Sequence, residues 1–153
     1  MRKDEVKCEV FLDTSSLVKL YHREDDTAIV ETIFKEFAVK TVFLSELTKI
    51  EFTSTIWKKV RVQQIGELTA KEIIVNFESD ISKFTFIPIH TAIVEQARNL
   101  INRYGINGLR TLDSLQLSTA IYLKNQANLF VTSDKLLNSF FVNESLPTYN
   151  PLF

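Results

Sequence analysis

The feature that most restricts the fold of this chain is the alternation of short, strand-like apolar segments with longer helical patterns. The strand candidates are rich in aromatic and β-branched side chains, and the segments between them carry apolar residues at helical spacing. This order predicts βαβ units, and therefore an α/β fold with a short, mostly parallel central sheet of about five strands that helices cover on both faces. The strand candidates are Glu9–Leu12, Thr41–Leu44, Phe84–Ile87, Leu129–Thr132 and Pro147–Asn150.

Polar residues that can cap a helix stand at or near the start of the helical patterns. Their side chains would accept hydrogen bonds from the free amide groups of the first turn. The expected helices cover residues 28–37 after a cap at Asp25 or Asp26, 46–64 after Ser45, 71–81 with a start near Thr69, 92–104 with a start at Thr91, 112–124 after Thr111 and 134–141 after Ser133.

Length and composition predict a single domain over residues 1–153. The chain has 153 residues, 45% of them hydrophobic and 24% charged, with only three Gly and three Pro. Its apolar runs are far shorter than the roughly 20 residues of a membrane-spanning helix, and no apolar signal-peptide core follows the basic N-terminus. Cys8 is the single cysteine, so an internal disulfide is excluded. We therefore expect a cytoplasmic protein that does not enter the membrane.

The net charge of −1 limits how the protein could handle a polyanion. A whole-molecule attraction to nucleic acid is not implied by this charge. Binding to RNA or DNA would need a local basic patch or bound cations.

Four acidic residues stand where a purely structural sequence would place an apolar or small residue. Asp13 directly follows the first strand candidate, and Asp134 lies two residues beyond the fourth. Ligands bind to such sheets in the crevice beyond the carboxyl ends of the strands, so both positions are candidates for a site. Glu51 and Asp113 instead lie within helical patterns. We place Glu51 on the core-facing stripe with Leu47, Ile50, Ser54 and Trp57, and Asp113 on the apolar face with Leu117, Ala120 and Ile121.

Asp13, Asp113 and Asp134 each have a structural explanation when taken singly, whereas Glu51 lies beyond the first helical turn in which the dipole acts. A carboxylate near a helix N-terminus is stabilised by the dipole and the free amides, which is the simpler explanation for Asp113 or Asp134 taken singly. Asp134 could cap its helix, and Asp13 could form an Asx-turn with Ser15 or Ser16. Four carboxylates at one sheet edge would repel one another unless a cation lay between them. Oxygen ligands of this kind suit Mg²⁺.

Four segments resemble the motifs of the PIN-domain nucleases, and most closely the VapC-like toxins of toxin–antitoxin pairs. FLDTSSLVKLY resembles the opening Asp-Thr-Ser motif, with Asp13, and LSELTKIEFTSTIWKKV places an acidic residue at Glu51. LRTLDSLQLSTAIYL resembles the third motif, with Asp113, although Ser114 and Gln116 replace the commoner Ala and His. LFVTSDKLLN matches the Thr-x-Asp motif. This last motif supplies Thr132 and Asp134.

The resemblance implies a PIN-like three-layer fold and hydrolysis of RNA phosphodiesters with Mg²⁺ or Mn²⁺ as the metal. Asp13 and Asp113 would ligate the main ion, and Glu51 would ligate it through water or position the attacking water. Asp134 would complete the site or help to hold a second ion. Thr14, Ser15 and Thr132 would orient the carboxylates by hydrogen bonds.

RNA and protein partners follow from the same resemblance. Basic residues flank the acidic motifs and could contact the RNA backbone, with Arg110 and Lys135 favoured because they are nearest to Asp113 and Asp134 in the sequence. The family implies a homodimer and an antitoxin protein whose tail covers the active site. The basic candidates are Lys19, Lys49, Lys58, Lys59, Arg61, Arg110 and Lys135.

Three other interpretations stay open. The chain could be a PIN-domain nuclease for RNA processing that has no antitoxin, or a catalytically silent binding module that keeps the fold. A small α/β phosphate-handling switch would be phosphorylated at an aspartate, but the sequence offers no obvious lysine to pair with that aspartate. His22 and His90 lack the spacing of metal ligands.

Overall fold

Four parallel strands form the central layer of the protein, in the order β3-β2-β1-β4. The structure is a computed structural model that describes residues 7–23 and 27–149. The predicted α/β class and the parallel sheet are confirmed, but the sheet is smaller than predicted. Of the fifth candidate, Pro147–Asn150, only Thr148 pairs, in an isolated bridge with Phe130, and Asn150 lies outside the described residues. The strands are β1 (Lys7–Leu12), β2 (Ala38–Ser45), β3 (Thr85–Ile87) and β4 (Leu129–Val131).

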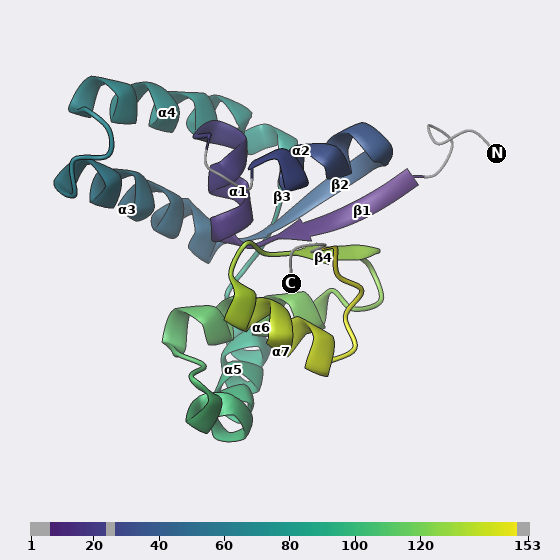
Figure 1. Ribbon diagram of the computed structural model, residues 1–153. Coiled ribbons are helices and arrows are strands. Elements are labelled where there is room, and N and C mark those ends of the chain that lie inside the picture. Colours follow the sequence, from purple (N-terminus) through teal and green to yellow (C-terminus); the bar gives the residue numbers. More distant parts are fainter. Residues whose placement is uncertain (1–6, 24–26, 150–153) are drawn as a thin grey trace.

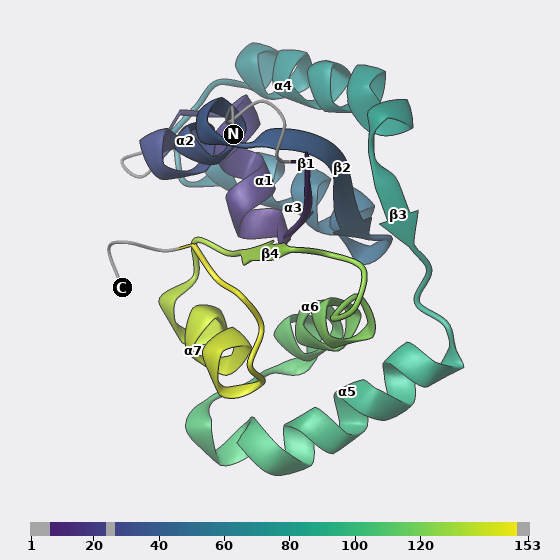
Figure 2. The ribbon, with the colours of Figure 1, turned by 90° about the vertical axis from the view of Figure 1, so that its right-hand side faces the viewer.

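Helices cover both faces of the sheet, so the fold has three layers. Figure 2 shows α1 to α4 on one side of the strands and α5 to α7 on the other, and Figure 1 shows the same two groups from a second direction. Two short 3-10 turns, Ile81–Lys83 and Gly105–Asn107, follow α4 and α5. The helices are α1 (Thr14–Tyr21), α2 (Thr27–Glu36), α3 (Leu47–Arg61), α4 (Glu67–Asp80), α5 (Thr91–Tyr104), α6 (Thr111–Tyr122) and α7 (Lys135–Asn143).

The alternation of side chains along the strands divides the core into two halves. In β1, Val10 and Leu12 pack under α1, α3 and α4, while Phe11 points to the opposite face and packs with the side chains of α6 and α7. In β4, Val131 and Phe130 divide between the two faces in the same way. Both faces are therefore buried, as expected of a parallel sheet between helices.

The carboxyl ends of β1 and β4 meet at one edge of the sheet. Leu12 is in register with Val131, and the amide of Asp13 donates to the carbonyl of Val131 at 3.2 Å. The residues that follow these two strands, Asp13 and Thr132, are thereby neighbours although they are far apart in the sequence. This edge is the position at which the sequence predicted a site.

Several helix boundaries differ from the prediction. The helix α1 was not predicted at all, and α4 begins at Glu67 rather than near Thr69. Of the two caps that the sequence allowed for α7, Ser133 and Asp134, the structure has Asp134. Ser45 ends β2, and its hydroxyl accepts from the amide of Leu47 at 3.1 Å, so it supports the first turn of α3 from outside the helix. The expected cap at Asp25 or Asp26 lies outside the described residues.

The expected core-facing stripe of α3 is wrong. Ile50 is 71% exposed, whereas Phe52 and Ile56 are fully buried. The buried side chains are Leu47, Thr48, Phe52 and Ile56, so the helix is rotated relative to the predicted stripe. Within the described ranges, 7–23 and 27–149, no helix has the length and apolar content that crossing a membrane requires.

Candidate active site

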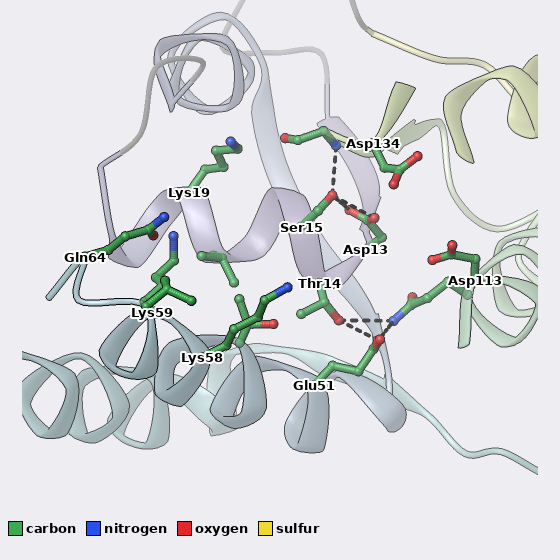
Figure 3. A pocket seen from close by; sticks show the side chains of 15 residues that line it. Asp13, Thr14, Ser15, Lys19, Glu51, Lys58, Lys59, Gln64, Asp113 and Asp134 are labelled. Atoms are coloured by element: carbon green, nitrogen blue, oxygen red, sulfur yellow. Dashed lines mark hydrogen bonds between the residues drawn. The ribbon is translucent and has the colours of Figure 1, made fainter. Parts of the chain in front are cut away.

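A cleft of about 470 Å³ opens at the carboxyl edge of the sheet and contains all four predicted acidic residues. In Figure 3, Asp13, Asp113 and Asp134 lie close together at one end, Glu51 lies beside them, and Lys19, Lys58 and Lys59 lie at the other end. The cleft is lined by Asp13, Thr14, Ser15, Val18, Lys19, Glu51, Thr55, Lys58, Lys59, Val62, Gln64, Asp113, Gln116, Ser133 and Asp134.

Asp13 is held rigidly by hydroxyl and amide donors. Its Oδ1 accepts from the amide of Ser16 at 3.0 Å, which caps α1, and from the Ser16 hydroxyl at 2.9 Å. Ser15 Oγ lies 2.9 and 2.8 Å from the two carboxylate oxygens and donates to them. Asp13 is only 4% exposed, and burial raises its pKa although these hydrogen bonds lower it. The bond to the Ser16 amide is a helix cap rather than the expected Asx-turn, and it does not remove the electrostatic cost of burying the charge.

Thr132 joins the ends of β1 and β4. Its hydroxyl donates to Asp13 Oδ2 at 2.7 Å and accepts from the amide of Asp134 at 3.0 Å. Asp134 Oδ1 accepts from the amide of Leu137 at 2.8 Å and so caps α7. One oxygen of Asp134 is thus used by the helix, while the residue still lines the cleft.

Asp113 lies in the first turn of α6 and faces two other carboxylates. Burial is the largest cause of its raised pKa, followed by the charges of Asp134 and Asp13, and Arg110 offsets part of this effect. The charges of Asp134 and Asp13 are therefore close enough to Asp113 to disfavour the ionisation of its carboxyl group. Arg110 precedes the helix and acts on Asp113 without lining the cleft.

Glu51 is held by a buried polar network rather than by the other carboxylates. The Nε2 amide of Gln116 donates to Glu51 Oε1 at 2.8 Å, and the Thr14 hydroxyl donates to the same oxygen at 2.9 Å. Gln116 Nε2 also lies 3.1 Å from Thr48 Oγ1 and 3.2 Å from Thr14 Oγ1. Gln116 is 2% exposed, and its Oε1 atom is buried without a hydrogen-bond partner.

The donor set of the cleft suits a hard divalent cation that keeps part of its water shell. Carboxylate, hydroxyl and amide oxygens line the acidic end, and Mg²⁺ commonly binds through one or two carboxylates and several waters. Over residues 7–23 and 27–149, no group of three Asp, Glu, His or Cys side chains is arranged to hold a metal ion, so protein carboxylates alone would not complete its coordination. The mutual repulsion at Asp113 and the unpartnered Gln116 Oε1 are both features that such an ion would relieve.

The opposite end of the cleft is basic because the lysines that line it lie toward the C-terminal ends of two helices, α1 and α3. On α3, Glu51, Thr55 and Lys58 follow one another at helical spacing along the cleft wall, with Lys59 next to them. On α1, Asp13 lies at the N-terminal end and Lys19 lies in the last turn. The negative charge is therefore at the N-terminal ends of both helices and the positive charge toward their C-terminal ends (Figure 3).

A comparison with family models decides the relationship of the chain. The PIN domain model matches residues 10–140. The chain belongs to the PIN domain family. A comparison with curated proteins finds no match. The matched range contains all four acidic residues of the cleft.

Solved structures share this PIN fold at low sequence identity. FitAcB from Neisseria gonorrhoeae has a TM-score of 0.67 at 15% identity, over 93% of this chain and 97% of that chain. VapC20 from Mycobacterium tuberculosis, a sarcin–ricin loop cleaving toxin, has a TM-score of 0.64 at 14% sequence identity, and the match covers 85% of this chain and 93% of that chain. VapBC2 from Rickettsia felis, bound to a DNA fragment from its promoter, has a TM-score of 0.60 at 17% sequence identity, and the match covers 92% of this chain and 96% of that chain. At these identities the likeness shows the fold.

Most of the predicted site residues meet in the PIN cleft. Thr14 and Ser15 line it with the four acidic residues, and Thr132 contacts Asp13 from behind. Neither Arg110 nor Lys135, although both are described, is among the lining residues, whereas Lys19, Lys58 and Lys59 are. Sequence reasoning missed the roles of Gln116 and Thr48 at Glu51. The signal at Gln116 was a long polar side chain three residues after Asp113, on a helix face that is otherwise buried.

Proposed function

We propose that this PIN domain is a metal-dependent endoribonuclease that hydrolyses RNA phosphodiester bonds with Mg²⁺ or Mn²⁺, as the toxin of a VapBC-type toxin–antitoxin pair. The observation that carries the proposal is the convergence of Asp13, Asp113 and Asp134 on one cleft, with Glu51 beside them. Asp13 is buried and Asp113 is half-buried, so like charges gathered here are costly to the fold, and a divalent cation would reverse the local charge.

The residues of the acidic end divide into ligands and supports. Asp13 and Asp113 would hold the cation, and Asp134 would complete the site with the oxygen that α7 leaves free. When bound, the ion supplies charge neutralisation at the phosphate and lowers the pKa of water. The hydroxyls of Ser15 and Thr132 hold the carboxylate of Asp13 in place before any ligand arrives, so little reorganisation is needed on binding. Glu51 would orient the attacking water.

The basic end of the cleft supports an RNA substrate rather than a small phosphate compound. The seven residue steps from Glu51 to Lys58 correspond to about 10 Å along the axis of α3. At a rise of about 3.4 Å per nucleotide, this distance corresponds to about three stacked nucleotides. A single strand whose scissile phosphate lies at the acidic end would place the phosphate about three nucleotides further along at Lys58 and Lys59. Arg110 and Lys135 remain candidates for contacts outside the cleft.

An antitoxin and a second copy of the chain are the proposed protein partners. The name VapBC2 of one structural neighbour supports the antitoxin. Exposed apolar side chains at Leu68 and Val75 on α4 and at Phe34 on α2 offer surfaces for such contacts. The single cysteine, Cys8, is free and buried, which is compatible with action in the cytoplasm.

The proposal is tested by cleavage of single-stranded RNA by the purified protein, in EDTA and after addition of Mg²⁺ or Mn²⁺. We expect cleavage only with metal, and a loss of at least about a hundredfold in Asp113→Asn, because removing even a supporting group of a metal site costs 10- to 100-fold. Glu72→Gln, an exposed acid on α4, is the matched control and should cleave normally.

The same assay separates the competing functions. A silent binding module would bind RNA without cutting it under any metal condition. A processing nuclease would cut RNA but would not be inhibited by a small protein encoded beside it. Full activity of a well-folded Asp113→Asn protein would refute the assignment of the site.

A further inference from the structure

The most unusual polar group of the cleft is the side-chain amide of Gln116. The residue is 2% exposed, and only one end of its amide is used: Nε2 lies within 3.2 Å of three oxygens, to which its two hydrogens can donate, while Oε1 is buried without a partner. An unsatisfied buried oxygen is rare in folded proteins and costs free energy, so it needs an explanation.

The orientation of this amide is fixed by its neighbours. Glu51 Oε1 lies 2.8 Å from Gln116 Nε2, and an ionised carboxylate can only accept a hydrogen bond. Turning the amide over would set its oxygen against the carboxylate oxygen of Glu51. The nitrogen must therefore face Glu51, and the unpartnered oxygen is a consequence of that arrangement.

Gln116 also shares a helix face with Asp113. The two residues are three positions apart on α6, where side chains are neighbours, and both line the cleft. The amide thus lies between two acidic residues, donating to one and leaving an acceptor on the side of the helix that carries the other.

We propose that Gln116 is a positioning residue that couples Glu51 to the cation site: Nε2 holds the Glu51 carboxylate, and Oε1 is the acceptor kept for the hydrated cation. This inference rests on the proposed metal-dependent function. Amide oxygens suit hard cations and their waters, and groups that orient a ligand of a metal site contribute to its affinity. The network has a further support in Thr48 and Thr14, whose hydroxyls lie 3.1 Å apart and surround the same nitrogen.

The test compares Mn²⁺ affinity, measured by electron paramagnetic resonance and by titration calorimetry, in four forms of the full chain. Gln116→Met keeps the length but removes both polar atoms, and it should weaken Mn²⁺ binding about tenfold or more. Gln116→His can donate from one ring nitrogen to Glu51 and accept at the other, and it should stay within a few-fold of the wild type. Gln126→Met, at an exposed residue beyond α6, is the matched control and should bind normally.

The outcomes separate this inference from the function on which it rests. Equal Mn²⁺ affinity in the wild type and Gln116→Met would overturn the role of Gln116 and leave the metal site intact, and so would equal weakening in Gln116→Met and Gln116→His. A wild-type chain that binds no Mn²⁺ would overturn both proposals.

A second measurement needs no variant, so it tests the role of Gln116 even if Gln116→Met fails to fold. In the wild type, the side-chain NH₂ resonances of Gln116 should shift during a Mg²⁺ titration, with the same midpoint as the backbone amide of Asp113. A shift at Asp113 with no change at the Gln116 amide would contradict the coupling.

Discussion

The carboxylate of Asp113 is half-buried in the first turn of α6, where burial and the charges of Asp134 and Asp13 raise its pKa. In the unfolded chain the same group has an ordinary pKa, near 3.9. The folded protein therefore binds this proton more tightly than the unfolded chain does. Its stability falls as the pH rises from the ordinary pKa through the raised one, and the deficit persists at neutral pH.

Replacement of Asp113 by Asn should accordingly stabilise the metal-free protein. We expect a gain of about 0.5–2 kcal/mol in the free energy of unfolding at pH 7, the range typical of relieving one such unfavourable site. Below the ordinary pKa the gain should vanish, because the carboxyl group is then protonated in both states. Urea denaturation in EDTA at pH 7 and pH 3 measures both values, with Glu72→Gln as the control. A destabilised Asp113→Asn protein at pH 7 would show that the carboxylate serves the fold.

The Asp113 carboxylate lowers the stability of the fold, whereas Thr132 raises it, because the Thr132 hydroxyl stabilises the buried charge of Asp13. Its hydroxyl donates to Asp13 Oδ2 at 2.7 Å, and the side chain is completely buried. Thr132→Val keeps the shape and should cost about 1.5–3 kcal/mol at pH 7, the usual contribution of a hydrogen bond to a charged group. The loss should shrink in acid, where Asp13 is protonated. Thr85→Val, at an exposed residue of β3, should change the unfolding free energy by less than about 0.5 kcal/mol. Equal losses in the two variants would contradict this account.

At the scale of elements, α3 has two working faces, and this explains one failed prediction. One face packs Phe52 and Ile56 into the core, and the other presents Glu51, Lys58 and Lys59 to the cleft. Apolar spacing alone does not identify the core face, because exposed positions of the helix also carry apolar residues, and Ile50, which does not line the cleft, is one of them. The stripe through Ile50 was therefore assigned to the core, although Ile50 is 71% exposed.

The basic end of α3 gives a prediction about RNA binding. In an Asp113→Asn background, which should not cut the RNA, Lys58→Gln with Lys59→Gln should weaken binding to single-stranded RNA. The slope of log affinity against log salt should fall by about 1.4, since each phosphate contact on a single strand contributes about 0.7. The same double change at Lys35 and Lys71, exposed on α2 and α4, is the control. An unchanged slope in the cleft variant would mean that RNA does not reach these lysines.

The sequence predicted the strands better than the first helix. The cores of β1, β2, β3 and β4 lie within the predicted segments or overlap them, because short runs of aromatic and β-branched residues are distinctive. The helix α1 was not predicted because it begins with Thr14, Ser15 and Ser16, and hydroxyl residues are poor helix formers and good caps. Asp13 and its capping bond to Ser16 were foreseen only as a local turn.

At the scale of the whole molecule, parallel strands bring distant residues to one edge, and this rule made most of the site predictable. Asp13 and Asp134 follow adjacent strands, so their proximity follows from the topology. The network around Gln116 could not be predicted, because it depends on how α3 and α6 are rotated toward each other across the sheet edge. Rotations of this kind are set by packing, not by the order of elements.

The most direct test of the central claim is a crystal of the wild-type protein soaked in Mn²⁺ and examined for anomalous scattering. A peak bounded by the carboxylates of Asp13, Asp113 and Asp134 is the predicted result. A fully formed cleft with no peak among these three side chains, at a Mn²⁺ concentration that supports RNA cleavage, would contradict the account.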